Sequence, residues 1–179
     1  MRIISGKYKS RRIIAPKKLP VRPTTDMAKE ALFNILNNQY YFDEVVLLDL
    51  FSGTGNISYE FASRGTEKII AVDGDSGCVQ FIDKISKELD FNIDAIKSDV
   101  FSFLEKTTLK SDIIFADPPY DLPLENFEKI PQLVFEKELL LEDGVLIIEH
   151  AKHMKLDHLK HFSKARKYGG SVFSFFHIT

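Results

Sequence analysis

Residues 45–55 of this 179-residue chain read VVLLDLFSGTG, an apolar run broken by one acid and followed by a turn with two glycines. Such a run is typical of a buried central strand in a parallel sheet. The glycines let a ligand approach the backbone closely at the amino terminus of the next helix. From Gly53 the pattern is Gly-x-Gly-x-x-Ser, which lacks the third glycine of the dinucleotide fingerprint and is no Gly-x-x-x-x-Gly-Lys phosphate loop.

Strand and helix patterns alternate through the rest of the chain with short connections. They predict helices at 56–64, 76–88, 100–106 and 125–137, and strands at 68–72, 92–97, 112–116 and 144–149. Residues 168–171, Tyr-Gly-Gly-Ser, are a hairpin signal, so strands at 161–168 and 171–178 should be antiparallel neighbours. This order predicts a doubly wound α/β sheet with an antiparallel C-terminal hairpin and a site along the carboxyl ends of its strands.

The beginning of the chain has a different character. Residues 2–4 and 12–14 are short β-prone runs that predict a small β-hairpin, and three prolines between 16 and 23 keep the connector extended. Thr24 and Thr25 then provide a helix start, and helical spacing continues to about residue 38. We therefore divide the chain into a basic hairpin and linker, 1–25, and a main domain, 26–179.

The net charge of −2 conceals an asymmetry along the chain. Residues 1–22 carry eight cations and no acid, whereas the remainder carries 16 cations against 26 acids. A basic segment on an acidic body is a candidate nucleic-acid contact, although charge alone leaves a merely solvated arm as an equal alternative. The cations proposed for RNA contact are Arg2, Lys7, Lys9, Arg11, Arg12 and Arg22.

Several classes of protein are disfavoured by composition. No apolar run approaches the roughly 18 residues that span a bilayer, and the amino terminus lacks a secretory signal. One cysteine, Cys78, excludes an internal disulfide. No metal site is predicted, because no cysteine accompanies the histidines of the last third, His150, His153, His158 and His161. A cytoplasmic enzyme or binding protein without a membrane or metal partner fits these observations.

Acids lie at the ends of three successive predicted strands. Asp49 lies near the carboxyl edge of its strand, where a buried carboxylate needs a partner such as a ligand ammonium. Asp73, 20 residues beyond Gly53, is placed to accept bonds from ribose hydroxyls. Asp99 is placed to accept from an adenine amine or simply to cap a helix. No phosphate-binding cation lies among them, so S-adenosylmethionine fits better than NAD or ATP; the candidate cofactor residues are Asp49, Phe51, Gly53, Gly55, Asp73, Asp99 and Val100.

The fourth predicted strand ends in Asp117-Pro118-Pro119-Tyr120. Two prolines make a rigid corner that carries a carboxylate, a backbone carbonyl and an aromatic ring. The Asp117 carboxylate and the Pro118 carbonyl are suited to accept hydrogen bonds from an exocyclic amine, which localises its lone pair. Tyr120 is suited to stack on the base, a contact of about 1–3 kcal/mol. We assign catalysis to Asp117, Pro118, Pro119 and Tyr120.

The chain resembles the bacterial 16S rRNA guanine-N2 methyltransferases over nearly its whole length. Residues 1–9 match the opening of that family, and Arg22-Pro23-Thr24-Thr25-Asp26 with residues 29–36 matches its most distinctive segment. Residues 49–55, 63–65 and 117–120 match its cofactor and catalytic motifs. Met27 departs from the pattern, because an arginine is usual there, and so does Asp73, where glutamate is common.

The resemblance implies a Rossmann-like, seven-stranded sheet and S-adenosylmethionine-dependent methylation of one guanine of 16S rRNA, the guanine at position 966. It implies that the basic hairpin grips rRNA and that Arg22 and Thr24 lie near the reaction centre. The expected partner is 16S rRNA in the small subunit or in an assembly intermediate, and the expected state is a monomer.

Other readings stay open from the residues alone. Related Pro-Pro-Tyr corners serve adenine-N6 methylation and methylation of a protein glutamine, and a non-catalytic ribosome-assembly factor would retain the fold. The corner itself does not distinguish adenine from guanine. Glu149, at the end of the fifth predicted strand, is interpreted as an acid satisfied by its neighbours.

Overall fold

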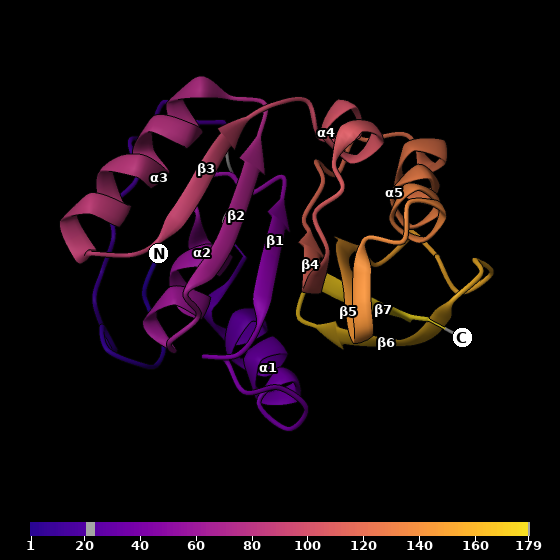
Figure 1. Ribbon diagram of the computed structural model, residues 1–179, viewed down its shortest axis with the longest axis horizontal. Coiled ribbons are helices and arrows are strands. Elements are labelled where there is room, and N and C mark those ends of the chain that lie inside the picture. Colours follow the sequence, from indigo (N-terminus) through magenta and orange to yellow (C-terminus); the bar gives the residue numbers. More distant parts are fainter. Residues whose placement is uncertain (21–23, 179) are drawn as a thin grey trace.

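The computed structural model describes residues 1–20 and 24–178 (Figure 1). In that part of the chain seven strands form one sheet in the order β3-β2-β1-β4-β5-β7-β6, with five helices around it. The strands are β1 Val46–Leu50, β2 Lys68–Asp73, β3 Ile93–Lys97, β4 Ser111–Ala116, β5 Leu140–Ala151, β6 Phe162–Tyr168 and β7 Ser171–His177. The helices are α1 Asp26–Leu36, α2 Asn56–Ser63, α3 Ser76–Leu89, α4 Val100–Lys106 and α5 Leu124–Glu136.

Strands β1 to β5 are parallel and β7 runs antiparallel to both β5 and β6. This confirms the predicted sheet with its C-terminal hairpin. From β1 the chain first builds outward through β2 and β3 and then returns to place β4 on the other side of β1. Ligands of open α/β sheets bind at such a reversal, beyond the carboxyl ends of the strands.

Most predicted elements end within two residues of their observed bounds, but β5 is longer than the predicted 144–149. Residues 142–144, Glu-Asp-Gly, have the composition of a turn. In the structure they form a bulge instead, where Asp143 takes a left-handed φ of 61° and the pairing with β4 shifts register. The bulge keeps the strand continuous back to Leu140.

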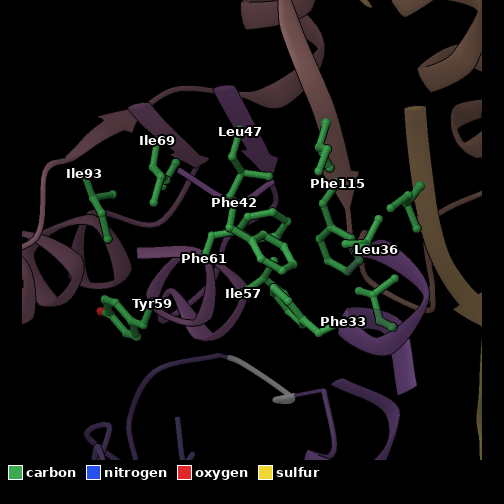
Figure 2. Packing of buried hydrophobic residues seen from close by; sticks show 14 of the residues in the cluster. Phe33, Leu36, Phe42, Leu47, Ile57, Tyr59, Phe61, Ile69, Ile93 and Phe115 are labelled. Carbon is green, nitrogen blue, oxygen red and sulfur yellow. The ribbon is translucent and has the colours of Figure 1, made fainter. Parts of the chain in front are cut away.

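Alternating strand residues supply two cores on opposite faces of the sheet. Leu47, Ile113 and Ile147 pack under α1, α2 and α3, whereas their successors, such as Leu48 and Ile148, pack under α4 and α5. Figure 2 shows the first core, where rings gather between helix and sheet. It contains Phe33, Phe42 and Phe61, with 4.8 Å between the ring centroids of Phe33 and Phe61.

In the amino-terminal arm, residues 1–20, the two runs of the predicted small hairpin pair, but only over a short stretch. Arg2 and Arg12 form one isolated antiparallel bridge. The Ser10 N–H adds one bond to the Ile3 carbonyl, and the N–H groups of Ile4 and Ser5 then bind the carboxylate of Glu60 on α2 at 2.8 and 3.0 Å. The arm is therefore attached to the body mainly through α2, by the Glu60 carboxylate and by the carbonyl and hydroxyl of Ser63.

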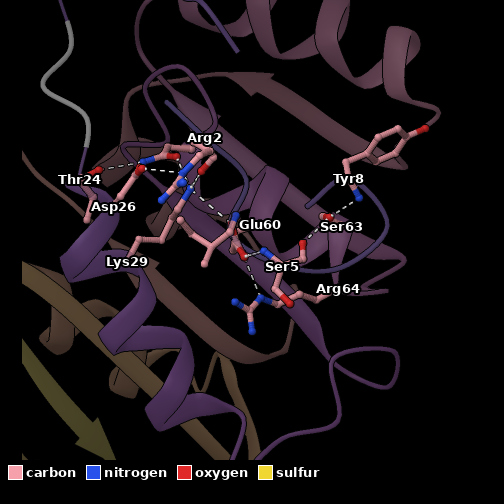
Figure 3. Close-up of polar contacts among 11 residues, drawn as sticks. Arg2, Ser5, Tyr8, Thr24, Asp26, Lys29, Glu60, Ser63 and Arg64 are labelled. Atoms are coloured by element: carbon pink, nitrogen blue, oxygen red, sulfur yellow. Dashed lines mark hydrogen bonds and ion pairs between the residues drawn. The ribbon is translucent and has the colours of Figure 1, made fainter. Parts of the chain in front are cut away.

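Lys29 of α1 is the buried cation beside that carboxylate (Figure 3). Its Nζ lies 3.4 Å from Glu60 Oε2 and donates to the Arg2 carbonyl and to Asn56 Oδ1, at 2.6 and 2.8 Å. Burial lowers the pKa of Lys29, and the neighbouring Glu60 opposes that shift. Arg64 completes the cluster, donating to Glu60 Oε1 at 2.9 Å while its guanidinium lies over the Phe33 ring.

Removing Glu60 tests how much this cluster stabilises the fold. Glu60→Ala leaves the Lys29 charge buried without its carboxylate and leaves the two arm N–H groups without an acceptor. The free energy of unfolding should fall by about 3–5 kcal/mol in urea denaturation. The matched control, Glu105→Ala, removes an exposed pair with Lys129 and should cost at most about 1 kcal/mol. Equal losses in the two variants would contradict the role given to Glu60.

Candidate active site

A cavity of about 870 Å³ opens at the carboxyl ends of the parallel strands, at the reversal between β1 and β4. All four residues of the predicted proline corner line it, and so do six of the seven predicted cofactor residues. The exception is Gly55, the last residue of the loop before α2, which does not line the cavity. The residues that line the cavity include Thr24, Asp49, Phe51, Ser52, Gly53, Asp73, Asp99, Val100, Asp117, Pro118, Pro119, Tyr120, Glu149 and Ser171.

The loop from β1 to α2 depends on left-handed backbone at three positions. Phe51, Gly53 and Gly55 have φ values of 55°, 52° and 86°. A Cβ at Gly55 would lie 2.7 Å from the Tyr59 ring, so glycine is required there for space as well as for conformation. Phe51 adopts the same region without being glycine, at a cost of about 1–3 kcal/mol, and packs edge-on against Phe101. Such strain is typical of ligand-binding loops.

Asp73, predicted to bind ribose, also holds two loops in place. One carboxylate oxygen accepts the Gly53 N–H at 2.8 Å and the other accepts the Asp75 N–H at 2.8 Å. A carboxylate has about four acceptor sites, so it can accept ribose hydroxyls in addition to these bonds. The side chain thereby links the loop after β1 to the loop after β2.

Asp49 is a buried carboxyl group, only 1% exposed, at the base of the cavity. Burial raises its pKa to about 7, although the Ser58 hydroxyl opposes the shift by donating to it at 2.6 Å. The nearby Asp73 raises the pKa further. A cationic ligand group in the cavity would stabilise the ionised form.

The cavity suits an adenosyl cofactor with a cationic tail. Ser52 Oγ is buried at its wall and makes no hydrogen bond within the described residues, so it offers a donor to a ligand. The lining includes no lysine, arginine or histidine from residues 1–20 and 24–178. Asp99 lies at the rim and caps α4 by accepting the Ser102 N–H, so its capping role is present beside any ligand role.

The proline corner is fixed to the strand that carries Asp49. The N–H of Asp117 donates to the Leu50 carbonyl at 3.3 Å, and the Pro119 carbonyl closes a turn with the Leu122 N–H. The Pro118 carbonyl accepts no hydrogen bond from the described part of the chain. The Tyr120 hydroxyl lies 3.4 Å from Ser171 Oγ, at the tip of the terminal hairpin.

The predicted RNA-binding residues separate into two groups. Arg2, Lys7, Lys9, Arg11 and Arg12 are exposed on the arm, where Arg2 pairs with Asp26 and Arg11 pairs with Glu88. Thr24 is instead buried and lines the cavity. Arg22 lies outside the described residues.

One acid of the cavity wall escaped sequence reasoning. Glu149 is only 2% exposed and lines the cavity, where it accepts a bond from Thr24 Oγ1 at 2.8 Å. The available signal was an acid ending an otherwise apolar strand. His150 beside it has a pKa lowered by burial, with its ring nitrogens near Ser174 Oγ and the Ala151 carbonyl.

The residues that the structure describes contain no group of three or more His, Cys, Asp or Glu side chains placed to hold a metal ion. In the same ranges no helix has the length and apolar character needed to cross a membrane.

A sheet with this strand order and a cavity at its reversal point, lined by strand-end acids, defines a protein with the Rossmann-like methyltransferase fold. A family model described as conserved hypothetical protein 95 matches residues 1–177, and the chain belongs to that family.

Its relatives include proteins named ribosomal RNA small subunit methyltransferase D. The protein of that name from Buchnera aphidicola (Baizongia pistaciae) is 31% identical over 150 residues, covering 83% of this chain and 75% of the relative. The protein from Escherichia coli K12 is 29% identical and covers 83% and 74%. Among solved structures, a hypothetical protein of Thermus thermophilus, TTHA0928, has a TM-score of 0.85, with 23% identity and 99% of each chain covered.

Asp49 makes stability depend on pH in a definite direction. The pKa of Asp49 is about 7 in the folded protein, against an ordinary value of 3.8. The folded state therefore binds the proton more tightly than the unfolded state, and this stabilisation is lost as the pH rises between the two pKa values. The side chain of the Asp49→Asn variant stays uncharged at every pH. Without ligand, the melting temperature of the variant should therefore rise relative to that of the wild type between about pH 4 and pH 8.

Asp94→Asn, an exposed change on β3, should show no such trend. A constant difference between wild type and Asp49→Asn across the range would contradict the assigned titration.

Proposed function

We propose that this protein is an S-adenosylmethionine-dependent methyltransferase that modifies the exocyclic N2 amine of a guanine in 16S rRNA. The observation that carries the proposal is the joining of two sets of residues in one cavity. Asp49 and Asp73 lie on one side of the reversal point, and the corner Asp117–Tyr120 lies on the other. The names of the family's relatives point to rRNA of the small subunit.

The cofactor brings an electrophilic methyl group on a sulfonium. Asp73 and Asp99 are the residues that would hold its ribose and adenine, and the buried Asp49 would stabilise its cationic tail. Gly53 and Gly55 would let the cofactor lie close to the backbone of the loop, and Phe51 and Val100 would flank its adenine. The lining acids thus explain why a cationic adenosyl ligand is preferred over a phosphorylated one.

The acceptor amine is prepared by the proline corner. The Asp117 carboxylate and the Pro118 carbonyl accept its hydrogen bonds, which localise the nitrogen lone pair and aim it at the methyl group. Pro119 keeps the corner rigid, and Tyr120 stacks on the base. The guanine must leave its stack to enter the cavity, at a cost of a few kcal/mol. Positioning of nitrogen and methyl carbon in line supplies most of the remaining gain.

In this proposal residues 1–25 form the rRNA-gripping segment and residues 26–179 carry catalysis. The exposed cations Lys7, Lys9 and Arg12 of the arm make no ion pair within the described residues and are placed to meet phosphates. Arg2 and Arg11 would exchange their present carboxylate partners for phosphate. The protein would act as a cytoplasmic monomer, without a metal, on the small subunit or an assembly intermediate.

Asp117→Ala separates an enzyme from a non-catalytic assembly factor. With labelled S-adenosylmethionine and unmethylated small subunits, the wild type should transfer label to guanine N2, and the variant should lose at least about 100-fold in rate. Cofactor and subunit binding should persist, because in this proposal the Asp117 carboxylate acts on the acceptor amine and not on the cofactor or the arm.

Glu125→Ala, an exposed change in the first turn of α5, should keep full activity. Full turnover by Asp117→Ala would refute the catalytic assignment, and a wild type that binds cofactor without transferring label would refute the substrate.

The arm predicts salt-sensitive binding. If about four of its cations meet phosphates, log affinity for subunits should fall with log salt at a slope of roughly −3.6. The double variant Lys7→Ala/Lys9→Ala should bring the slope to roughly −1.8 because two phosphate contacts are lost. Lys106→Ala/Lys110→Ala, exposed cations at the end of α4 and beside the start of β4, should leave it unchanged. A flat salt response of the wild type would refute the role of the arm.

A further inference from the structure

Two acids lie next to each other at the carboxyl ends of β4 and β5. Ala116 of β4 pairs with Ile148 of β5, so Asp117 and Glu149 are the next residues of two neighbouring parallel strands. Residues two positions earlier, Phe115 and Ile147, both belong to the core under α1. Because side chains alternate along a strand, Asp117 and Glu149 face that same side, and both line the cavity.

Glu149 is held in one orientation by a chain of contacts. The Thr24 hydroxyl donates to its Oε2 at 2.8 Å, and the Thr24 carbonyl accepts from Asn56 Nδ2 at 3.1 Å. Asn56 Oδ1 in turn accepts from the buried Lys29 (Figure 3). A carboxylate has about four acceptor sites. Glu149 can therefore accept a further donor from a ligand while it keeps Thr24.

The Watson–Crick edges of the bases differ in what they offer to two adjacent carboxylates. Guanine presents two neighbouring donors, N1–H and the N2 amine. Adenine presents an amine beside the acceptor N1, cytosine an amine beside the acceptor N3, and a glutamine side chain an amine beside a carbonyl. With any of the last three, the second carboxylate would face an acceptor in a desolvated site, which is strongly unfavourable.

We propose that Glu149 is the specificity residue for the acceptor base, accepting the N1–H of guanine while the neighbouring Asp117 accepts the N2 amine. This inference rests on the proposed function and deepens it, because it gives the physical reason for guanine over adenine or glutamine. Thr24 acts as its positioning residue. Selection of the base thus depends on Glu149 at the end of β5 and on Thr24, which precedes α1.

The test uses 2-aminopurine, which keeps the amine at C2 but has an acceptor at N1. Small subunits are reconstituted from ligated 16S rRNA that carries guanine or 2-aminopurine at the nucleotide that the wild type methylates. The ratio of kcat/KM for the two substrates is measured for the wild type and for Glu149→Gln. The missing O6 and the altered amine of 2-aminopurine affect the wild type and the variant equally. A difference between the two proteins in the ratio of kcat/KM therefore reports on residue 149.

The guanine preference should fall at least about tenfold in Glu149→Gln, because the glutamine amide can donate to N1 of 2-aminopurine. Glu142→Gln, an exposed change on the same strand, should keep the wild-type ratio. An unchanged ratio in Glu149→Gln overturns the inference. The proposed function fails separately, if the wild type transfers no methyl group to guanine-containing subunits.

If Glu149→Gln turns over neither substrate, equilibrium binding replaces kinetics. Fluorescence of 2-aminopurine reports its exit from the stack, and guanine-containing subunits serve as competitors. The variant should lose the wild-type preference for the guanine competitor by at least about tenfold while it binds S-adenosylmethionine normally, which shows that it is folded. A wild-type competition ratio in the variant overturns the inference.

Discussion

The buried carboxylate of Glu60 is the contact on which the arrangement around the cavity depends. It lies on α2, the helix that begins at the glycine loop, and it holds the arm through two backbone donors and α1 through Lys29. Lys29 then reaches Asn56 at the start of α2, and Asn56 holds Thr24. The contacts of a single acid thus connect the arm, α1, the start of α2 and the segment at Thr24. A buried ion pair need not add stability overall, but it fixes which segments meet.

The reversal of strand order divides the cavity into two halves with different chemistry. The half at β1, β2 and β3 carries the strand-end acids. Among them, Asp73 accepts one backbone N–H from the loop after β1 and one from the loop after β2. The half at β4 and β5 carries the rigid corner and Glu149, on strands that neighbour each other in register. The Asp117 N–H, bonded to the Leu50 carbonyl, joins the halves. In the proposed reaction this bond sets the position of the acceptor amine relative to the methyl group.

The sequence was sufficient for the sheet and for bringing the strand-end acids Asp49, Asp73 and Asp99 to one cavity. Those residues follow strands whose apolar runs are unmistakable, and parallel strands bring their carboxyl ends to one edge whatever the details of packing. The Lys29–Glu60 pair was not predictable in this way, because a charged residue on an amphipathic helix is usually solvated and only tertiary packing buries it. Glu149 was missed as a cavity residue for a related reason, since its neighbour Thr24 is 125 positions away and no local pattern connects them. The arm and β5 depart less from prediction: the two runs of the arm pair at a single bridge, and β5 extends back to Leu140 through residues 142–144, whose composition is that of a turn.

The way in which the arm is attached has a consequence for how this family can diverge. Glu60 binds the main-chain N–H groups of positions 4 and 5, and the Ser63 carbonyl and hydroxyl accept the N–H groups of Lys7 and Tyr8. Main-chain donors are nearly the same for every amino acid except proline. Side chains on the outer surface of the arm are therefore free to change from one species to another, following changes in the RNA that we propose they meet. The anchor that holds the arm in place would survive those substitutions unaltered.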